Sequence, residues 1–350
     1  MVETPLIIPI FFPTMGCGER CLFCNLKTTP EGLPSPSSVR NFIEASVARI
    51  SSGKKTREKQ VAFYGGSFTA IDRHNQIRYL KEVQPFLASG LIDSIRISTR
   101  PDALDEEILS LLKKYGVKTI EVGVQSMIDD VLHLARRGHS AADTADAVSR
   151  LRDKGFEVGL QLMIGLPGDT CDRFLQTLDQ VIELKPDFVR IHPTLVLKGA
   201  PLENLWRAGG YAPLSLDEAV QWLKKGILKL KKSSLQVARI GLQPTEELEK
   251  DYLAGPYHPA IHQLIDSAIF FDMATSLLQT SQKNGQALFL CHPREVSNLR
   301  GQKNENILKL KNHFNLSGIL IEGREEFPKG FLGLQTPEGM ISIDRQSLGS

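Results

Sequence analysis

The sequence of 350 residues is poor in aromatic side chains and carries almost no excess of charge. Aromatic residues make up 7% of it, with only two tryptophans, and the formal net charge is +2. So small an excess gives no general argument for a nucleic-acid partner, although local basic runs occur. The hydrophobic fraction of 41% is ordinary for a globular protein, and long disordered stretches are therefore not expected.

Long hydrophobic runs are lacking as well. The apolar segment from Pro5 to Pro13 is too short to cross a bilayer, contains prolines, and lacks the basic lead-in of a signal peptide. A buried strand is the better interpretation of this segment. We therefore expect a soluble, cytoplasmic protein that has no membrane partner.

Cysteine is scarce and unevenly placed. Of the five cysteines, Cys17, Cys21 and Cys24 fall within eight residues, whereas Cys171 and Cys291 lie far along the chain. A secreted disulfide scaffold would be denser in cysteine and usually even in number. Three thiols so close together predict metal ligands in a reducing compartment, and the two distant cysteines are interpreted as buried thiols.

Short apolar runs alternate with amphipathic helical patterns over the first two thirds of the chain. Strands are predicted at 6–12, 59–64, 93–99, 117–125, 156–164 and 187–193. Six strands alternating with five helices predict parallel β-α units joined by right-handed crossovers. Because the chain is too short for eight such units plus its remainder, we expect an α/β fold with a partial (β/α)6 TIM-like barrel.

Polar residues occupy one face of these predicted strands, opposite an apolar face that should pack under the helices. This pattern predicts a lumen that holds a ligand instead of a packed core. The alternative is an open antiparallel sheet with one solvent-exposed face, and the helices predicted between the strands argue against it. The polar residues are Arg96, Ser98, Glu121, Gln125, Gln161, Arg190 and His192.

The last third of the chain follows a different pattern. Two helices are predicted at 215–232 and 259–282, and short strands at 286–291, 316–321, 330–335 and 340–344. We therefore expect two domains, a core over residues 1–245 and a smaller α+β appendage over residues 246–350.

The segment from Cys17 to Cys24 is the main candidate for a metal site. It follows the first predicted strand, and its cysteines have the spacing C-x3-C-x2-C. Three thiolates can hold three irons of a [4Fe–4S] cluster and leave the fourth iron open to an outside ligand. Structural zinc and ferredoxin-like electron transfer are the alternatives. Both usually need four protein ligands, which a distant histidine could complete for zinc.

This segment resembles the radical S-adenosylmethionine superfamily, whose usual motif is C-x3-C-x-aromatic-C, with Phe23 as the aromatic residue. The resemblance implies a [4Fe–4S] cluster on Cys17, Cys21 and Cys24. It also implies S-adenosylmethionine as the second cofactor, chelated by the open iron and cleaved reductively so that hydrogen is removed from a substrate. An electron donor such as a flavodoxin or ferredoxin is implied too.

Further segments match that superfamily in the expected order. The run Tyr64-Gly65-Gly66-Ser67 resembles the glycine pair that meets the amino group of the methionine moiety, and glycine allows so close an approach of backbone. Ser67 is counted with the pair as cofactor-binding.

Three more cofactor contacts are implied by the resemblance. Gln125 and Arg137 match residues that contact the methionine part of the cofactor, and an arginine fork suits a carboxylate. Gly165 opens a loop that resembles the one near the adenosine portion. A solvated charge at a helix end remains the alternative for Arg137, and a simple strand-to-helix turn the alternative for Gly165.

The likeness is greatest to the radical domain of the Elongator catalytic subunit and to oxygen-independent coproporphyrinogen III oxidase-like proteins, over roughly residues 5–245. It implies a radical enzyme, either an oxidoreductase or a transferase, with a polar substrate; a base in RNA is the first expectation. The Elongator subunit spaces its first two cysteines further apart, so its wobble-uridine activity is not carried over. A cluster-bearing, non-catalytic binding protein or haem chaperone is the alternative function. No catalytic side chain is identified.

Overall fold

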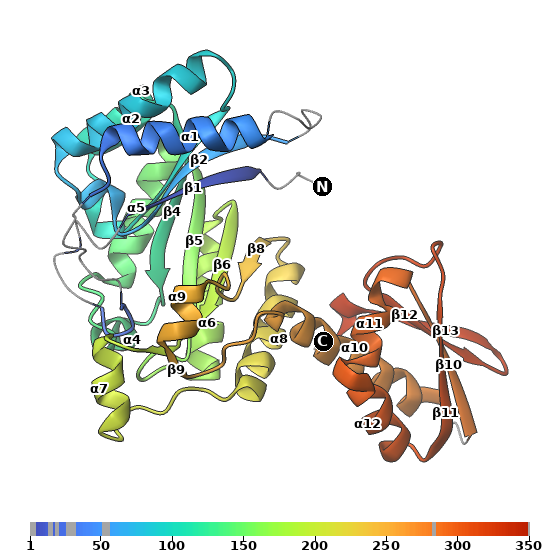
Figure 1. Ribbon diagram of the computed structural model, residues 1–350. Coiled ribbons are helices and arrows are strands. Elements are labelled where there is room, and N and C mark those ends of the chain that lie inside the picture. Colours follow the sequence, from blue (N-terminus) through green and yellow to red (C-terminus); the bar gives the residue numbers. More distant parts are fainter. Residues whose placement is uncertain are drawn as a thin grey trace. The chain divides into compact units, whose positions relative to one another are not determined.

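The computed structural model describes residues 5–12, 17, 21–25, 33–50, 57–281 and 285–348. The chain forms two compact units (Figure 1). The first contains Met1–Pro213, Leu235–Arg239 and Thr245–Ala254, and the second contains Leu214–Ser234, Ile240–Pro244 and Gly255–Ser350. The predicted domain boundary between residues 245 and 246 stays a prediction.

A seven-stranded sheet is the centre of the first unit, in the order β1-β2-β3-β4-β5-β6-β8. Its first six strands pair in parallel, which confirms the predicted β-α units. The last strand, β8, was not predicted from the sequence. The strands are β1 Leu6–Phe12, β2 Lys59–Gly65, β3 Ser94–Thr99, β4 Val117–Gln125, β5 Glu157–Ile164, β6 Phe188–Pro193 and β8 Gln236–Ile240.

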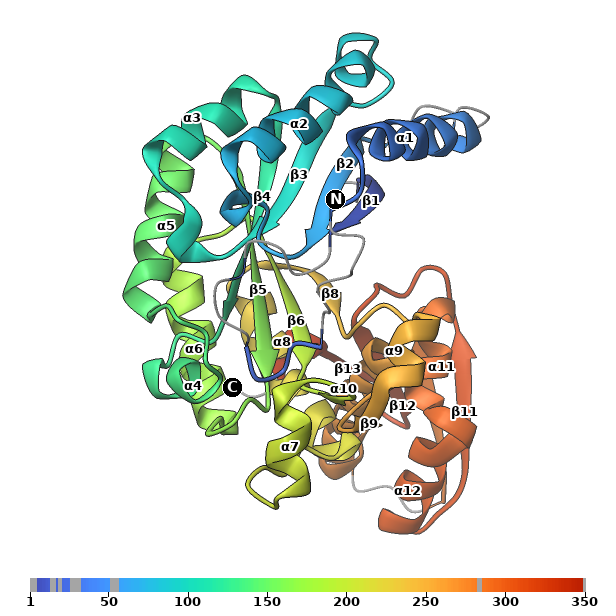
Figure 2. The same cartoon turned by 60° about the vertical axis from the view of Figure 1, so that its left-hand side comes forward.

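Helices cover the outer face of this sheet, as the predicted crossovers require (Figure 2). Several begin at side chains that cap free backbone amides. Ser140 and Asp143 form the predicted capping box of α5, and Thr170 caps α6. The covering helices are α1 Pro36–Ile50, α2 Arg73–Ala88, α3 Glu106–Lys114, α5 Ala141–Asp153 and α6 Cys171–Leu184.

The sheet curls into a half-barrel, and one contact shows how strongly. Nη2 of Arg190 on β6 lies 3.2 Å from the hydroxyl oxygen of Tyr64 on β2, although β3, β4 and β5 separate these strands in the sheet. A flat sheet would hold the two strands roughly 19 Å apart, at close to 4.8 Å per strand. The polar strand faces therefore converge on one lumen, as predicted.

The ring of Phe188 on β6 packs over Gly159 on β5, inside the half-barrel. A Cβ atom on Gly159 would lie 2.2 Å from Cζ of Phe188, so only glycine leaves room for the ring. The guanidinium carbon of Arg96 lies 5.0 Å from the centre of the same ring. The ring and the guanidinium thus pack together deep in the lumen, where Arg96 also donates to the buried side chain of Gln60.

Short elements close the first unit where the parallel strands end. β7 pairs in antiparallel fashion with β9, and the helices α4, α7 and α9 lie nearby in the chain. None of them was predicted from the sequence. They are α4 Asp129–Leu134, β7 Val196–Leu197, α7 Pro201–Arg207, α9 Glu246–Asp251 and β9 Tyr252–Ala254.

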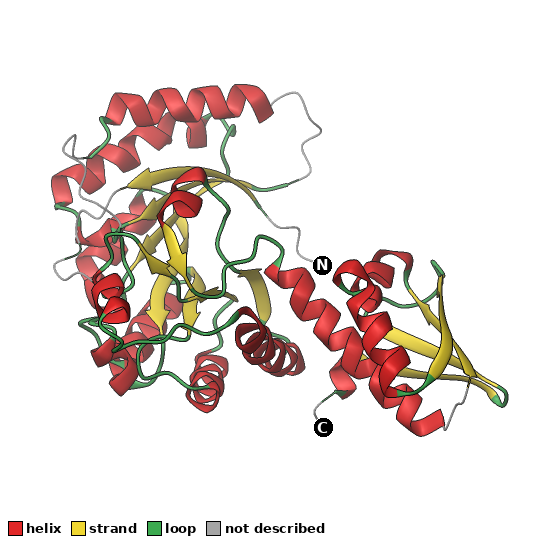
Figure 3. Cartoon of the chain, turned by 60° about the horizontal axis from the view of Figure 1, so that its bottom comes forward, coloured by secondary structure: helices red, strands yellow, loops and turns green. Residues whose placement is uncertain are grey.

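The second unit is α+β, as expected for the appendage. Its four-stranded sheet has the order β11-β10-β12-β13, with β10 parallel to β11 and antiparallel to β12, and helices lie on one face of it (Figure 3). The elements are α8 Leu216–Lys232, α10 Ile261–Ser281, β10 Gly285–Cys291, α11 Val296–Arg300, α12 Glu305–His313, β11 Leu316–Gly323, β12 Phe331–Thr336 and β13 Gly339–Asp344.

A buried ion network stabilises the second unit. Arg345 donates from Nη2 to Glu295 at 2.8 Å and lies 3.4 Å from Asp266 on α10. Glu295 also accepts the backbone amide of Gly330 at 2.9 Å. Among the described residues, no helix is long and apolar enough to span a membrane.

Candidate cofactor site

The segment around Cys21 and Cys24 is anchored by backbone hydrogen bonds to later parts of the chain. Leu22 donates its amide to the carbonyl of Ala135 at 3.1 Å, and its own carbonyl accepts the amide of Leu202 at 2.8 Å. The amide of Cys24 donates to the carbonyl of Cys21 at 3.1 Å, which closes a tight turn. These bonds hold two of the three cysteines at the carboxyl end of the sheet.

Phe23, the aromatic residue of the motif, packs between two apolar clusters. One is formed by Val131, Ala135, Met163 and Leu166. The other contains Leu22, Val196 and Leu202. The aromatic position before the last cysteine thus serves as a packing anchor, which explains why the motif needs bulk there.

Each of the first two cysteines lies beside a polar side chain from another element. Sγ of Cys17 is 3.6 Å from Oγ of Ser67, which follows β2. Arg137 donates from Nη1 to Sγ of Cys21 at 3.1 Å. Cys17 and Cys21 also interact electrostatically with Arg100, whose Nη2 donates to the carbonyl of Arg137 at 3.2 Å. The thiolate is the form of cysteine that binds metal.

Within the part of the chain that the structure describes, no three Cys, His, Asp or Glu side chains are grouped so that they could hold a metal ion. Residues 13–16, 18–20 and 26–32, which flank the three cysteines, lie outside the described ranges. The chemistry of the donor set nevertheless fits an iron–sulfur cluster, because cysteine thiolates are the usual ligands of such clusters.

At Gly65, the end of β2 lies very close to the backbone of β1. Its φ is +107°, and a Cβ there would lie 1.9 Å from the carbonyl oxygen of Phe12, so no other residue fits. Gly66 donates its amide to that same oxygen at 3.2 Å. This geometry brings the predicted run from Gly65 to Ser67 next to the end of β1 and to Cys17.

Gln125 ends β4 in an unusual conformation. Its φ is +71°, and the pairing of β4 with β5 shifts register between Gly123 and Gln125. The side chain is only 4% exposed, and its Oε1 has no hydrogen-bond partner. A strained residue with an unsatisfied buried acceptor marks a position where a ligand donor is expected.

Arg137 lies against the same stretch of β4. It is 8% exposed, donates from Nη2 to the carbonyl of Gly123 at 2.5 Å, and has a buried Nε without a partner. A Cβ on Gly123 would lie 3.1 Å from Nε2 of Gln125 and 3.5 Å from Nη2 of Arg137. The structure thus brings Cys21, Gln125 and Arg137 together, and Arg137 is not a solvated charge.

His139 is a further buried side chain close to Arg137. Its Nε2 lies 3.3 Å from the carbonyl of Val124, whereas its buried Nδ1 has no partner. Burial, aided by the positive charge of Arg137, lowers the pKa of His139 to about 4. The imidazole is therefore neutral at physiological pH.

Gly165 is fixed by hydrogen bonds at both its backbone amide and its backbone carbonyl. Its amide donates to Oδ2 of Asp169 at 3.0 Å, and its carbonyl accepts the hydroxyl of Tyr211 at 2.6 Å. Burial raises the pKa of Asp169 to about 6. Tyr211 was not predicted as a site residue, because it reaches the loop from a segment 46 positions later.

A buried carboxylate lies at the centre of the lumen. Glu121 accepts from Nη1 of Arg96 at 2.7 Å and from the hydroxyl of Tyr64 at 2.9 Å. Its other oxygen lies 3.1 Å from Nε of Arg190. Burial, with the charge of Glu121, raises the pKa of Tyr64 to about 12, so the phenol keeps its proton. Burial, with the charges of Arg190 and Arg239, lowers the pKa of His192 to about 4.

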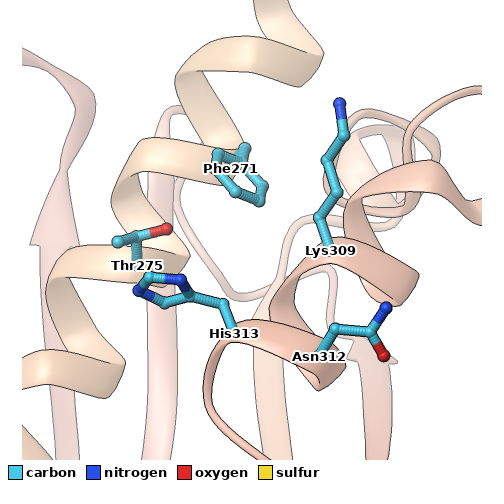
Figure 4. A pocket seen from close by; sticks show the side chains of 5 residues that line it. All are labelled: Phe271, Thr275, Lys309, Asn312 and His313. Atoms are coloured by element: carbon cyan, nitrogen blue, oxygen red, sulfur yellow. The ribbon is translucent and has the colours of Figure 1, made fainter.

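Other features lie apart from this constellation. Cys291 is buried as predicted, whereas Cys171 at the start of α6 is half-buried. A surface hollow of about 570 Å³ in the second unit, between α10 and α12, contains none of the predicted site residues (Figure 4). It is lined by Phe271, Thr275, Lys309, Asn312 and His313.

Comparisons with known proteins agree with this geometry. Residues 11–181 match the family model described as Radical SAM superfamily, and residues 186–270 match the Radical_SAM C-terminal domain. The chain is 30% identical over 189 residues to the tRNA uridine(34) acetyltransferase of Methanocaldococcus jannaschii, covering 48% of this chain and 35% of that one. It is 33% identical over 130 residues to human Elongator complex protein 3, covering 36% of this chain and 24% of that one.

A solved structure shares the fold. Elp3 of Methanocaldococcus infernus with an N-terminal deletion aligns with a TM-score of 0.60 and 22% identity, over 80% of this chain and 64% of that one. The matches span only 35% and 24% of the lengths of the two curated relatives named above. The two family matches nevertheless take in most of its length, and the chain belongs to the radical SAM superfamily of enzymes, whose cofactors are a [4Fe–4S] cluster and S-adenosylmethionine.

Proposed function

We propose that this protein cleaves S-adenosylmethionine reductively and abstracts hydrogen from a base in RNA. The observation that carries the proposal is the convergence of Cys21 with Gln125 and Arg137, which follow it by more than 100 residues in the sequence. Arg137 contacts the Cys21 thiol while its Nε and the amide oxygen of Gln125 stay buried without partners. Such groups need a polar ligand beside the cluster.

Cys17, Cys21 and Cys24 would hold the cluster. With three protein ligands, one iron stays open for the amino and carboxylate groups of S-adenosylmethionine. When bound, these cofactors supply the one-electron cleavage and the hydrogen abstraction. The guanidinium of Arg137 stabilises the negative charge of the thiolates, and Phe23 fixes the backbone that carries them.

The other predicted residues would position S-adenosylmethionine. Gly65 and Gly66 offer backbone without side-chain bulk, and Ser67 offers a hydroxyl next to Cys17. The amide oxygen of Gln125 would accept a hydrogen bond from the ammonium group of S-adenosylmethionine, and Arg137 would bind its carboxylate. Gly165, held in place by Asp169 and Tyr211, would present the backbone that meets the adenosine.

RNA is proposed as the substrate class because the relatives' names concern tRNA. The archaeal relative is a tRNA uridine(34) acetyltransferase, and the match covers 35% of its length. The lumen fits a polar base, since Tyr64, Glu121 and Arg190 present a hydroxyl, a carboxylate and a guanidinium there. A flavodoxin or ferredoxin is the proposed source of the electron.

The first test is an anaerobic assay for 5′-deoxyadenosine. The parent protein is reconstituted with iron and sulfide, supplied with S-adenosylmethionine and a strong reductant, and compared with the variant Cys17→Ala, Cys21→Ala, Cys24→Ala. Iron content and the electron paramagnetic resonance of the reduced cluster are measured on both. We expect a loaded, active parent and an iron-free, inactive triple variant. The control Cys171→Ala should match the parent.

Two results would overturn the proposal. A parent that binds zinc and no iron would contradict the cluster. A parent with a full cluster that makes no 5′-deoxyadenosine, with or without added RNA or cell extract, would favour the alternative of a cluster-bearing binding protein or haem chaperone.

A further inference from the structure

Phe11 presents an aromatic ring on the lumen face of the half-barrel. Its neighbour Phe12 points the other way, since the Phe12 ring packs against that of Tyr79 on α2, with the ring centroids 4.7 Å apart. Successive side chains of a strand point to opposite faces, so Phe11 lies on the inner face of β1. The parallel register agrees, because Phe11 pairs with Tyr64, whose hydroxyl accepts a hydrogen bond from Arg190 across the lumen.

The side chain of Phe11 is unusually open. It is 59% exposed, more than any other large hydrophobic side chain among the described residues. Other strands carry polar residues on the inner face, such as Arg96 on β3, Glu121 on β4 and Arg190 on β6. A phenylalanine that stays exposed contributes little through its own burial, whereas a ligand that covered the ring would remove a large apolar surface from water. Packing of the chain itself therefore does not account for an aromatic residue here.

The ring lies beside the backbone that is proposed to meet S-adenosylmethionine. A Cβ atom on Gly65 would lie 3.2 Å from Cζ of Phe11, so the tip of the ring is next to this glycine. The same run of chain continues to Ser67, whose hydroxyl oxygen is 3.6 Å from Sγ of Cys17. A group held on the ring would thus lie near the proposed cofactors, as hydrogen abstraction requires.

The surroundings distinguish Phe11 from an ordinary exposed phenylalanine. Single apolar side chains are common on protein surfaces, and Phe42, 48% exposed on the outer helix α1, is one of them. Phe11 instead lies one strand, about 4.8 Å, from Tyr64. The Tyr64 hydroxyl is bonded to the carboxylate of Glu121 and the guanidinium of Arg190. An aromatic face next to such polar groups suits a nucleobase, which stacks with its ring and hydrogen-bonds at its edge.

We propose that Phe11 is the stacking platform for the substrate base, and that Tyr64 and Arg190 face the edge of that base. This inference rests on the proposed function, because it takes the ligand to be a base in RNA. Every base has an aromatic face, so stacking on Phe11 supplies affinity and the polar groups supply the choice between bases. Glu121 acts as a positioning residue, since it holds the Tyr64 hydroxyl at 2.9 Å.

The test measures RNA binding by the reconstituted full chain, separately from turnover. The probe is a fluorescent anticodon stem-loop with uridine at position 34, the position in the archaeal relative's name, and its affinity is measured by anisotropy. Phe11→Leu keeps an apolar side chain but removes the ring, so it should weaken binding about ten-fold. Phe11→Tyr keeps the ring and should bind like the parent. The matched control Phe42→Leu should bind like the parent too, and melting temperatures check that each variant is folded.

A chemically altered RNA separates stacking from hydrogen bonding. Dihydrouridine at position 34 keeps the polar edge of uridine, but its ring is no longer flat and stacks poorly. It should weaken binding by the parent about as much as Phe11→Leu does, and the two changes together should cost little more than either alone. A Phe11→Leu variant that binds the uridine RNA as tightly as the parent does would refute the platform while leaving an RNA substrate in place.

A fluorescence measurement separates failure of the platform from failure of the proposed function. The RNA, free uridine and S-adenosylmethionine are added in turn to Phe11→Trp and to the parent, whose own two tryptophans give the background. Quenching of the added tryptophan by uridine, when the parent binds no RNA, would keep the platform and reject RNA as the substrate. Quenching by S-adenosylmethionine alone would assign the ring to the cofactor's adenine, and the proposal would be wrong. No quenching by any of the three would refute the platform itself.

Discussion

At the scale of single residues, Gln125 shows how a strand end becomes a binding position. Glutamine rarely adopts a φ of +71°, and here the strain coincides with a shift of register and a buried amide oxygen without a partner. Neighbouring structure must hold such a conformation in place. We infer that the strain aims the amide at a ligand, since packing alone would not require it.

His139 makes a prediction about pH. Its pKa is lowered to about 4 in the folded protein, against about 6.5 in an unfolded chain. Between these values the unfolded state binds more protons than the folded state, so the stability of the protein falls as the pH falls from about 6.5 to about 4. His139→Gln removes this contribution. The loss of unfolding free energy between about pH 7 and about pH 5 should shrink by about 2 kcal/mol.

Denaturant titrations of the parent and of His139→Gln at the two pH values check this expectation. His192 contributes in the same direction, so the variant keeps part of the dependence. The control His74→Gln removes an exposed imidazole from α2 and should behave like the parent. An unchanged pH dependence in His139→Gln would contradict the account of a neutral, buried imidazole.

Sequence alone could name many site residues but not their neighbours. The cysteine spacing, the glycine pair, Gln125 and Arg137 were predictable because each belongs to a motif with its own chemistry. Tyr211 was not, because it reaches the loop at Gly165 from a segment whose local pattern carries no sign of the site. That the predicted residues contact the cofactors stays a prediction.

At the scale of elements, the contact of β5 with β6 through Gly159 and Phe188 makes a second prediction. Gly159→Ala places a methyl group 2.2 Å from the buried Phe188 ring. Overpacking of this kind should cost about 1–3 kcal/mol of unfolding free energy. Because the φ of Gly159 is not positive, the cost comes from lack of space and not from the backbone.

A double-mutant cycle checks that reason. Phe188→Leu creates room, so Gly159→Ala should be less damaging in its presence, and the coupling energy should be favourable by about 1 kcal/mol or more. Additive effects of the two substitutions would show that the ring is not what excludes the methyl group.

The parallel strands were predictable because their apolar runs are bounded and alternate with amphipathic helices, so two periodicities agree. The short elements were missed for an equally physical reason. α4 and α9 have six residues each, and β7 has two, too few for any periodicity to be read. Their form is set by tertiary contacts, such as the pairing of β7 with β9.

At the scale of the whole molecule, every residue proposed to hold a cofactor belongs to the first unit. A ligand that binds only the folded state stabilises the part that it contacts. Loading with the cluster and S-adenosylmethionine should therefore slow amide hydrogen exchange at the carboxyl ends of β2, β4 and β5. Exchange in the sheet formed by β10 to β13 should stay the same.

Hydrogen exchange with mass spectrometry, run anaerobically on loaded and unloaded protein, measures both sheets in one experiment. The triple cysteine variant serves as the control, and added S-adenosylmethionine should leave its exchange unchanged. Equal protection of both units in the parent would mean that the cofactors act on the second unit too.

The order in which the chain is made has a consequence for cluster assembly. The cysteine segment is synthesised first, yet Arg137, which contacts the Cys21 thiol, follows it by 116 residues, and Asp251, which accepts a hydrogen bond from Asn25, follows by 226. At translation rates of about 5–20 residues per second, roughly 10 to 45 s pass before the last of these partners exists. During that time the thiols have no folded site around them. A cluster that is delivered to the folded site therefore arrives only after the first unit has been synthesised.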